Sequence, residues 1–182
     1  NPGQRIFQSN EDYREYIELV AAGCKRARVT VLGYCLLPKQ VQLILVPPNA
    51  KALRNALGEA HRRFTRSVNM RRARKGGLFR GRFASFPMDK PSLPLVMRFV
   101  EQSAVRSRAA KNARDWRWSS AAAHLKGKPD GFIDVKPLAK LAKTWTFFLT
   151  RRLNRPDGSF AGIVSVGLDP AYFSNYYDEL EI

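Results

Sequence analysis

The sequence predicts an α+β fold, and three observations support this prediction. The periodic segments follow the order helix, strand, strand, helix, strand. A strong turn signal at 154–158 separates two later strands. An apolar content of 45% in 182 residues suffices for the core of one domain with a small appendage. This order is that of a ferredoxin-like βαββαβ sandwich lacking its first strand, followed by a C-terminal β-hairpin and helix.

The first predicted helix covers residues 9–27. Ser9 and Asp12 form a capping box, in which each side chain bonds the other residue's backbone N–H. The apolar residues recur at helical spacing and define one stripe: Tyr13, Tyr16, Ile17, Val20, Ala21 and Cys24. Cys24 and Cys35 both fall in apolar patterns, so we expect two buried, reduced thiols rather than a disulfide framework or metal site.

Two strands are predicted at 28–37 and 40–46, where β-branched and apolar residues flank the turn at 38–39. Asn49 caps the long helix that follows, and the glycine pair at 76–77 is expected to end it. The apolar face of this helix comprises Leu53, Ala56, Leu57, Ala60, Phe64 and Val68.

The later elements carry weaker signals. Residues 78–86 predict a short strand, and residues 91–113 predict a helix with Val96, Phe99 and Val100 on its apolar face. Near the end, the 154–158 turn joins two strands, and Asp169 caps a final helix with Pro170 at its first position. Trp116 and Trp118 are expected in the core or at helix caps.

The charge distribution predicts a polyanionic partner. The net charge is +17; residues 1–140 hold 28 basic and 10 acidic side chains, whereas residues 141–182 hold 4 and 5. Nucleic acid is the first candidate and an anionic membrane surface the second. No apolar run reaches transmembrane length and no signal-peptide pattern is present, so we expect a cytoplasmic location. Because residue 1 is Asn, we expect a trimmed, processed or partial chain.

An arginine-rich cluster is the expected nucleic-acid contact: Arg62, Arg63, Arg66, Arg71, Arg72, Arg74, Lys75, Arg80 and Arg82. The guanidinium fork suits phosphate and also stacks on bases, and few acidic residues lie nearby in the sequence. A solvated charged face is the alternative. Phe79 and Phe83 alternate with two of these arginines and suit base stacking, although core packing explains them nearly as well.

Six separated motifs resemble those of the REP-associated tyrosine transposases, members of the HUH single-tyrosine superfamily. They are QRIFQSNEDYREYIELV, RVTVLGYCLLPKQVQLILVPP, AHRRFTRSVN, GGLFRGRF, MRFVEQSAVR and DWRWSSAAAHL. The resemblance covers residues 2–149, and we place a first, HUH-type domain at 1–149. It implies single-stranded DNA chemistry, in which a divalent cation (Mg²⁺ or Mn²⁺) polarises a phosphate and a tyrosine attacks it.

The residues that the family uses for catalysis are replaced here. The resemblance places Gln40 and Gln42 where the family has the metal-binding His-x-His, Phe99 where it has the tyrosine, and Ser103–Ala104 where it has Asn-Pro. Amide oxygens are poor ligands for transition metals, and Mg²⁺ normally takes a carboxylate. A phenylalanine has no hydroxyl to attack phosphorus. We therefore expect no intact catalytic residue, no metal and no cofactor on a retained fold, with the first strand of the family's sheet outside this sequence.

Residues 149–182 are similar to the Cache sensor domains of diguanylate cyclases. The shared pattern is a strand ending in Arg-Arg-Leu, a PDGSF turn, a second strand and a Leu-Asp-Pro helix. Two strands and one helix cannot enclose a metabolite, so we expect a fragment, assigned to a second domain at 150–182. We also expect its hairpin to pack on the first domain and shield an edge or face.

The leading hypothesis is a DNA-binding protein of transposase descent that holds single-stranded or hairpin DNA without nicking or strand transfer. An active metal-dependent transposase with another nucleophile, such as Tyr34, is the first alternative. A sensor or interaction protein that works through the Cache-like tail is the second, and a chain without a selected role is the third. His61 and His124 lie on separate predicted helices and are not expected to bind metal. The sequence leaves monomer and dimer open.

Overall fold

The computed structural model describes residues 5–79, 83–89, 91–134, 147–154 and 160–168. Its helices are α1 (Asn10–Ala27), α2 (Ala50–Arg71), α3 (Leu93–Glu101), α4 (Ser103–Arg106) and α5 (Ala121–Lys126), with a 3-10 turn η1 (Ala113–Asp115). Its strands are β1 (Thr30–Leu37), β2 (Gln40–Val46), β3 (Phe147–Asn154) and β4 (Phe160–Leu168). The predicted α+β class is confirmed. Among these described residues, no helix has the length and apolarity that crossing a bilayer requires.

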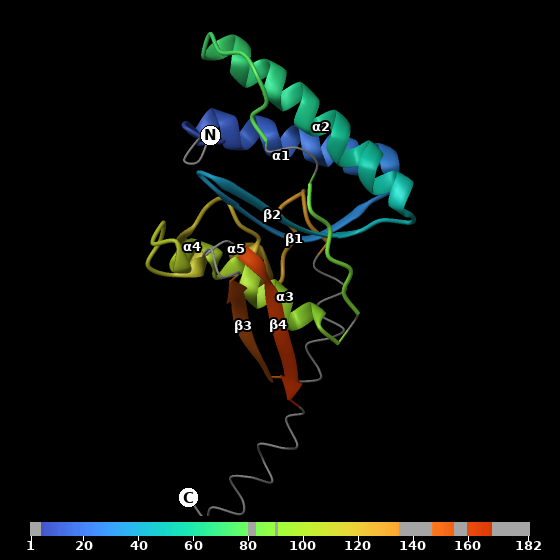
Figure 1. Cartoon of the computed structure of the whole chain (residues 1–182), viewed down its shortest axis with the longest axis vertical. Helices are drawn as coiled ribbons and strands as arrows, with labels where there is room; N and C mark the ends of the chain where they lie inside the picture. Colours follow the sequence, from blue (N-terminus) through green and yellow to red (C-terminus); the bar gives the residue numbers. More distant parts are fainter. Residues whose placement is uncertain (1–4, 80–82, 90, 135–146, 155–159, 169–182) are drawn as a thin grey trace, which may run out of the picture.

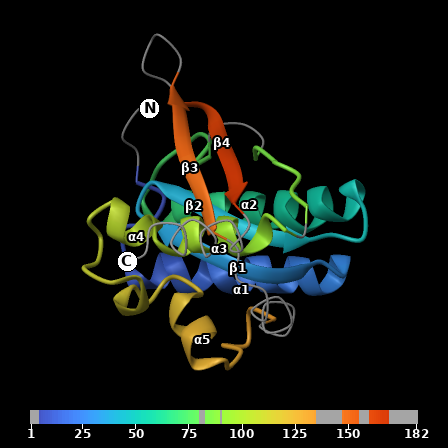
Figure 2. The ribbon, with the colours of Figure 1, turned by 90° about the horizontal axis from the view of Figure 1, so that it is seen from below.

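The antiparallel β1–β2 hairpin lies between two helical layers (Figure 1). α1 and α2 cover one face of the hairpin, and Figure 2 shows α3 crossing the other face. Because strand side chains alternate between faces, Leu43 packs against the core shared with α1 and α2, whereas its neighbour Ile44 packs against α3. The outer edge of β1 bonds to residues 118–120, where Leu36 N–H donates to the Trp118 carbonyl at 2.8 Å.

The start of α1 follows from its capping box, as predicted. Asp12 N–H donates to Ser9 Oγ at 3.3 Å, and Ser9 N–H donates to Asp12 Oδ2 at 3.2 Å. Tyr16 and Val20, on the predicted stripe, are fully buried. Asn49 caps α2 as predicted, since Ala52 N–H donates to its Oδ1 at 2.8 Å.

Close contact between α1 and α2 depends on Gly23. A Cβ added there would lie 2.5 Å from the Ala56 carbonyl oxygen, so we expect Gly23→Ala to lower the free energy of unfolding by about 1–3 kcal/mol. Gly58, within α2, has no heavy atom within 4 Å of an added Cβ. Gly58→Ala is therefore expected to stabilise by about 0.5–1 kcal/mol. Urea denaturation of the two variants measures both changes in the free energy of unfolding. Equal changes would contradict the close contact between α1 and α2 at Gly23.

The predicted end of α2 was wrong. The helix ends at Arg71 rather than at the glycine pair. Arg72 turns its guanidinium back to the Ile6 carbonyl at 3.1 Å, and Ala73 takes a positive φ of 48°. Tertiary hydrogen bonds therefore end this helix before the glycines are reached.

The predicted helix over 91–113 is broken, and its predicted apolar face was wrong in part. α3 ends at Glu101, and the short α4 follows. Val100 is buried as expected, but Val96 and Phe99 are only half-buried. The buried residues of α3 are Leu93, Leu95, Met97 and Val100.

The predicted strand over 78–86 is absent from the described part of that segment, where residues 78–79 and 83–86 have no strand geometry. Arg80 and Arg82 lie outside the described residues. Phe79 and Phe83 are both partly buried against the main core. Packing against the core thus buries part of each of these two rings.

The C-terminal hairpin is confirmed in its backbone pairing. β3 and β4 are antiparallel, with Phe147 opposite Leu168 and Asn154 opposite Phe160. The expected domain boundary between 149 and 150 falls within β3. The 155–159 turn and the helix expected after Asp169 lie outside the described residues, and packing of this hairpin on the first domain stays a prediction.

Candidate nucleic-acid interface

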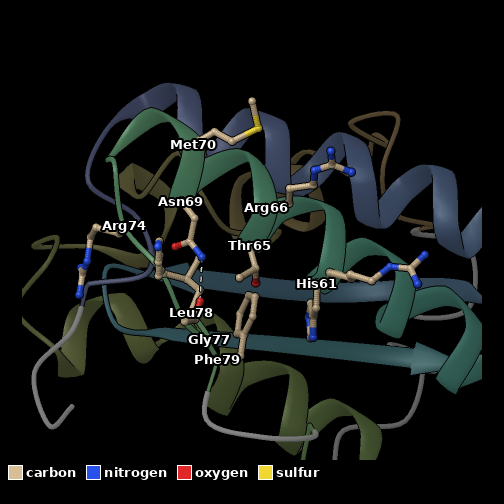
Figure 3. Close-up of a pocket in the computed structure, with 12 residues that line it drawn as sticks. His61, Thr65, Arg66, Asn69, Met70, Arg74, Gly77, Leu78 and Phe79 are labelled. Atoms are coloured by element: carbon tan, nitrogen blue, oxygen red, sulfur yellow. Dashed lines mark hydrogen bonds between the residues drawn. The ribbon is translucent and has the colours of Figure 1, made fainter.

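A groove of about 620 Å³ opens between α2 and residues 74–79 (Figure 3). Four basic residues of the predicted cluster line it: Arg62, Arg66, Arg74 and Lys75. Arg63 is exposed on α2 but does not line the groove. The structure thus brings part of the sequence-predicted cluster to one concave surface.

The inner wall of the groove is uncharged and carries both apolar and polar groups. Asn69 Nδ2 donates to the Gly76 carbonyl at 2.7 Å and so ties the 74–79 segment to α2. In Figure 3, Thr65 and Asn69 point toward this segment, whereas Arg66 and Met70 point away from it. Positive charge therefore lies along the rims, and neutral groups lie between them.

An aromatic pair closes one end of the groove. The Phe79 ring stacks on His61, with ring centroids 4.2 Å apart and an interplanar angle of 21°. His61 Nε2 lies 2.9 Å from the Tyr16 hydroxyl. Burial lowers the pKa of His61 to about 4 and raises the pKa of Tyr16. Tyr16 therefore donates and neutral His61 accepts at Nε2, which leaves the proton of His61 on Nδ1.

The neutral state of His61 predicts a pH effect on stability. Its folded pKa of about 4 lies below the unfolded value of 6.5, so the unfolded chain binds more protons in this range. Stability is then lost as the pH falls from 6.5 toward 4, by at most about 3 kcal/mol. His61→Gln keeps an acceptor for Tyr16 and is expected to reduce this loss. Denaturation midpoints of the wild type and of His61→Gln at pH 7, 6 and 5 check this prediction. If stability falls equally with pH in both proteins, His61 is not the group responsible.

Three arginines of the predicted cluster form ion pairs, and the expectation of few acidic partners was wrong for Arg71 and Arg72. Arg72 Nη2 lies 2.6 Å from Asp12 Oδ2, and Arg71 Nη2 lies 2.8 Å from Asp12 Oδ1. Arg71 also pairs with Glu15 at 2.7 Å, and Arg62 pairs with Glu59. The acidic partners of Arg71 and Arg72 come from α1, far away in the sequence. Among the described residues, Arg66, Arg74 and Lys75 form no ion pair.

The positions of the family's catalytic residues lie on the α3 side of the sheet. Gln42 Oε1 accepts from Ser103 Oγ at 2.6 Å, and Ser103 follows Phe99 by one helical turn. Gln40 is exposed at the start of β2. The structure thus places Gln42, Phe99 and Ser103 close to one another.

These residues do not fit a divalent cation. The Gln42 oxygen is already hydrogen-bonded, and the Arg106 guanidinium lies one hydrogen bond away, with its Nη2 2.6 Å from Ser103 Oγ. The described residues contain no group of three or more His, Cys, Asp or Glu side chains able to hold a metal ion.

Arg106 is a residue that the sequence analysis missed. Its guanidinium carbon lies 3.9 Å from the centroid of the Phe99 ring. The only signal in the sequence was spacing, since Phe99, Ser103 and Arg106 follow one another at i, i+4 and i+7.

Tyr34, the alternative nucleophile, is a buried residue of β1. Its hydroxyl donates to Asp130 at 3.2 Å, and burial raises its pKa. Cys24 and Cys35 are free and buried, as predicted, and burial raises their pKa values to about 11 and about 12. None of these three groups is placed for attack on an external phosphate.

The tryptophans and His124 have structural partners. Trp118 stacks on Tyr13 with centroids 4.8 Å apart, and Trp116 Nε1 donates to the Leu36 carbonyl at 2.9 Å. His124 Nδ1 lies 2.5 Å from Glu101 Oε1. Both tryptophans thus belong to the core, as predicted.

Comparison of the chain with protein-family models, with curated proteins and with solved structures gives no match. Both family resemblances therefore stay expectations.

Proposed function

We propose that this chain binds single-stranded or hairpin DNA through the groove between α2 and residues 74–79, without cutting it. The observation that carries the proposal is the combination, on one concave surface, of a half-buried aromatic pair with three cations that form no ion pair among the described residues. The framework is of ferredoxin-like type and of transposase descent.

Single-stranded DNA matches this chemistry better than a regular duplex. Phosphates attract the cationic rims, formed by Arg66 on one side and by Arg74 and Lys75 on the other. An unstacked base presents its flat face, which suits the half-buried Phe79–His61 pair. The side-chain amide oxygen of Asn69 and the hydroxyl of Thr65 supply polar groups between the two rims.

Three residues, two of them on the α3 side of the sheet, support the proposal that the chain binds DNA without cutting it. Gln42 is bonded to Ser103, Phe99 has no hydroxyl, and Tyr34 is buried. At these positions of the described residues, a metal-dependent tyrosine mechanism would therefore lack both its metal ligands and its nucleophile. A sensor function in the C-terminal hairpin gains no support from the described residues, and a thermal-shift screen with small carboxylates and amines tests it separately.

A gel experiment tests the proposal. The protein is mixed with end-labelled hairpin DNA that carries a single-stranded flank, in Mg²⁺ or Mn²⁺, and resolved on native and denaturing gels. We expect a native shift that weakens with salt, together with intact DNA on the denaturing gel. Cleaved or protein-linked DNA would overturn the non-cutting part, and no shift at low salt would overturn the binding part.

A further inference from the structure

A fixed guanidinium lies on the opposite side of the β1–β2 hairpin from the groove. Arg106 Nη2 donates to the Phe99 carbonyl at 2.5 Å and to Ser103 Oγ at 2.6 Å, and its carbon lies 3.9 Å from the Phe99 ring centroid. These three contacts hold the guanidinium plane in one orientation. Both Nη2 protons are used, whereas Nε and Nη1 have no hydrogen-bond partner among the described residues.

This cation also has no counter-ion in the part of the chain that the structure describes. No carboxylate there lies within ion-pair distance of Arg106. Desolvation lowers the pKa of Arg106, although the residue as a whole is exposed. A positioned and solvent-accessible arginine without an acid partner can receive an anion through its free N–H groups.

A second donor lies next to it. Ser103 Oγ accepts from Arg106, and its single proton points to Gln42 Oε1 at 2.6 Å or to the Phe99 carbonyl at 3.0 Å. The Gln42 side chain is thereby fixed beside the guanidinium. Its Nε2 protons have no hydrogen-bond partner among the described residues and supply a neutral donor.

We propose that Arg106 and Gln42 form a binding site for the oxyanion of a phosphate group. The free Nη1–H groups of Arg106 donate to a phosphate oxygen, and the Gln42 amide donates to the phosphate from the strand side. The Phe99 ring packs against one face of the guanidinium. This site is separate from the groove and stands whether or not the groove binds DNA.

Inorganic phosphate is the probe that tests it. The side-chain Nε–H of Arg106 and the backbone amides of 99–106 are followed by NMR while phosphate replaces chloride at constant ionic strength. We expect saturable shifts at these positions, with an apparent affinity that falls at least about tenfold in Arg106→Gln. Arg98→Gln, an exposed change on α3, removes the same charge and is expected to leave the shifts unchanged.

The outcomes separate this site from the groove. If the shifts persist in Arg106→Gln, or appear only in residues 61–79, the proposed site is wrong. A variant with Arg66, Arg74 and Lys75 all changed to Gln should keep the Arg106 response even where it loses DNA. If a single-stranded oligonucleotide moves the same resonances and competes with phosphate, the ligand is a phosphodiester of the strand. If only inorganic phosphate does so, the ligand is a free phosphate or a phosphomonoester.

Discussion

Replacing Arg72 with glutamine is expected to lower the free energy of unfolding by about 3 kcal/mol. Asp12 is only 3% exposed, and Arg72 is one of the two arginines that neutralise it. The same guanidinium bonds the Ile6 carbonyl, so the change also frees the segment before α1. The effect lies at the lower end of the range for a broken buried ion pair, because Arg71 still contacts Asp12 at 2.8 Å. Urea denaturation at pH 7, at constant m-value, measures it.

Arg66→Gln is the matched control on the same helix. Arg66 is exposed and has no ion-pair partner among the described residues, so its replacement is expected to change stability by less than about 0.5 kcal/mol. Equal stability of the two variants would show that the Asp12 pair contributes little.

Acid should remove the difference between these variants. Burial acts to raise the pKa of Asp12, but hydrogen bonds from the backbone of Gln8 and Ser9 and from both arginines outweigh it and lower this pKa below 3.8. The stabilisation is therefore present above about pH 4 and is lost as the pH falls through the folded value. The deficit of Arg72→Gln should shrink over the same range.

Changing Arg66, Arg74 and Lys75 together to glutamine is expected to weaken DNA binding on the order of 100-fold at low salt. Each residue lost removes a charge-assisted phosphate contact and the counterions that this contact releases. The slope of log affinity against log salt should fall by about 2 for a single strand. Fluorescence anisotropy with a labelled oligonucleotide at four salt concentrations measures both quantities.

A second triple variant removes the same charge elsewhere. Lys51, Arg54 and Lys128 are exposed and lie outside the groove, so their replacement by glutamine should leave most of the affinity and slope intact. Equal losses in the two variants would mean that net charge alone, rather than the groove, attracts the DNA.

Local signals in the sequence predicted the starts of α1 and α2 and the turn between β1 and β2. Ser9 and Asp12, Asn49, and the turn at 38–39 each act over three or four residues, and the structure places all of them as expected. Part of the groove was predictable for the same reason. Its cations and Phe79 come from one continuous stretch on a helix and the segment after it.

Long-range contacts account for the errors. Arg71 and Arg72 were assigned to DNA because few acids lie near them in the sequence, yet their partner Asp12 comes from another helix. Arg72 also bonds to Ile6 and so ends α2 earlier than its glycines would. Arg106 was overlooked because its meaning depends on Phe99 and on Gln42 from β2. In each case the deciding partner is set by packing rather than by sequence spacing.

The central claim is that the groove between α2 and residues 74–79 contacts DNA, and photo-crosslinking tests it most directly. A single-stranded oligonucleotide carrying 5-iodouracil is irradiated with the protein, and the linked peptide is identified by mass spectrometry. The account predicts linkage within residues 61–79, at or beside Phe79 and His61, and its loss in the groove triple variant. Linkage confined to residues 98–128, or none despite a shift on a native gel, would contradict it.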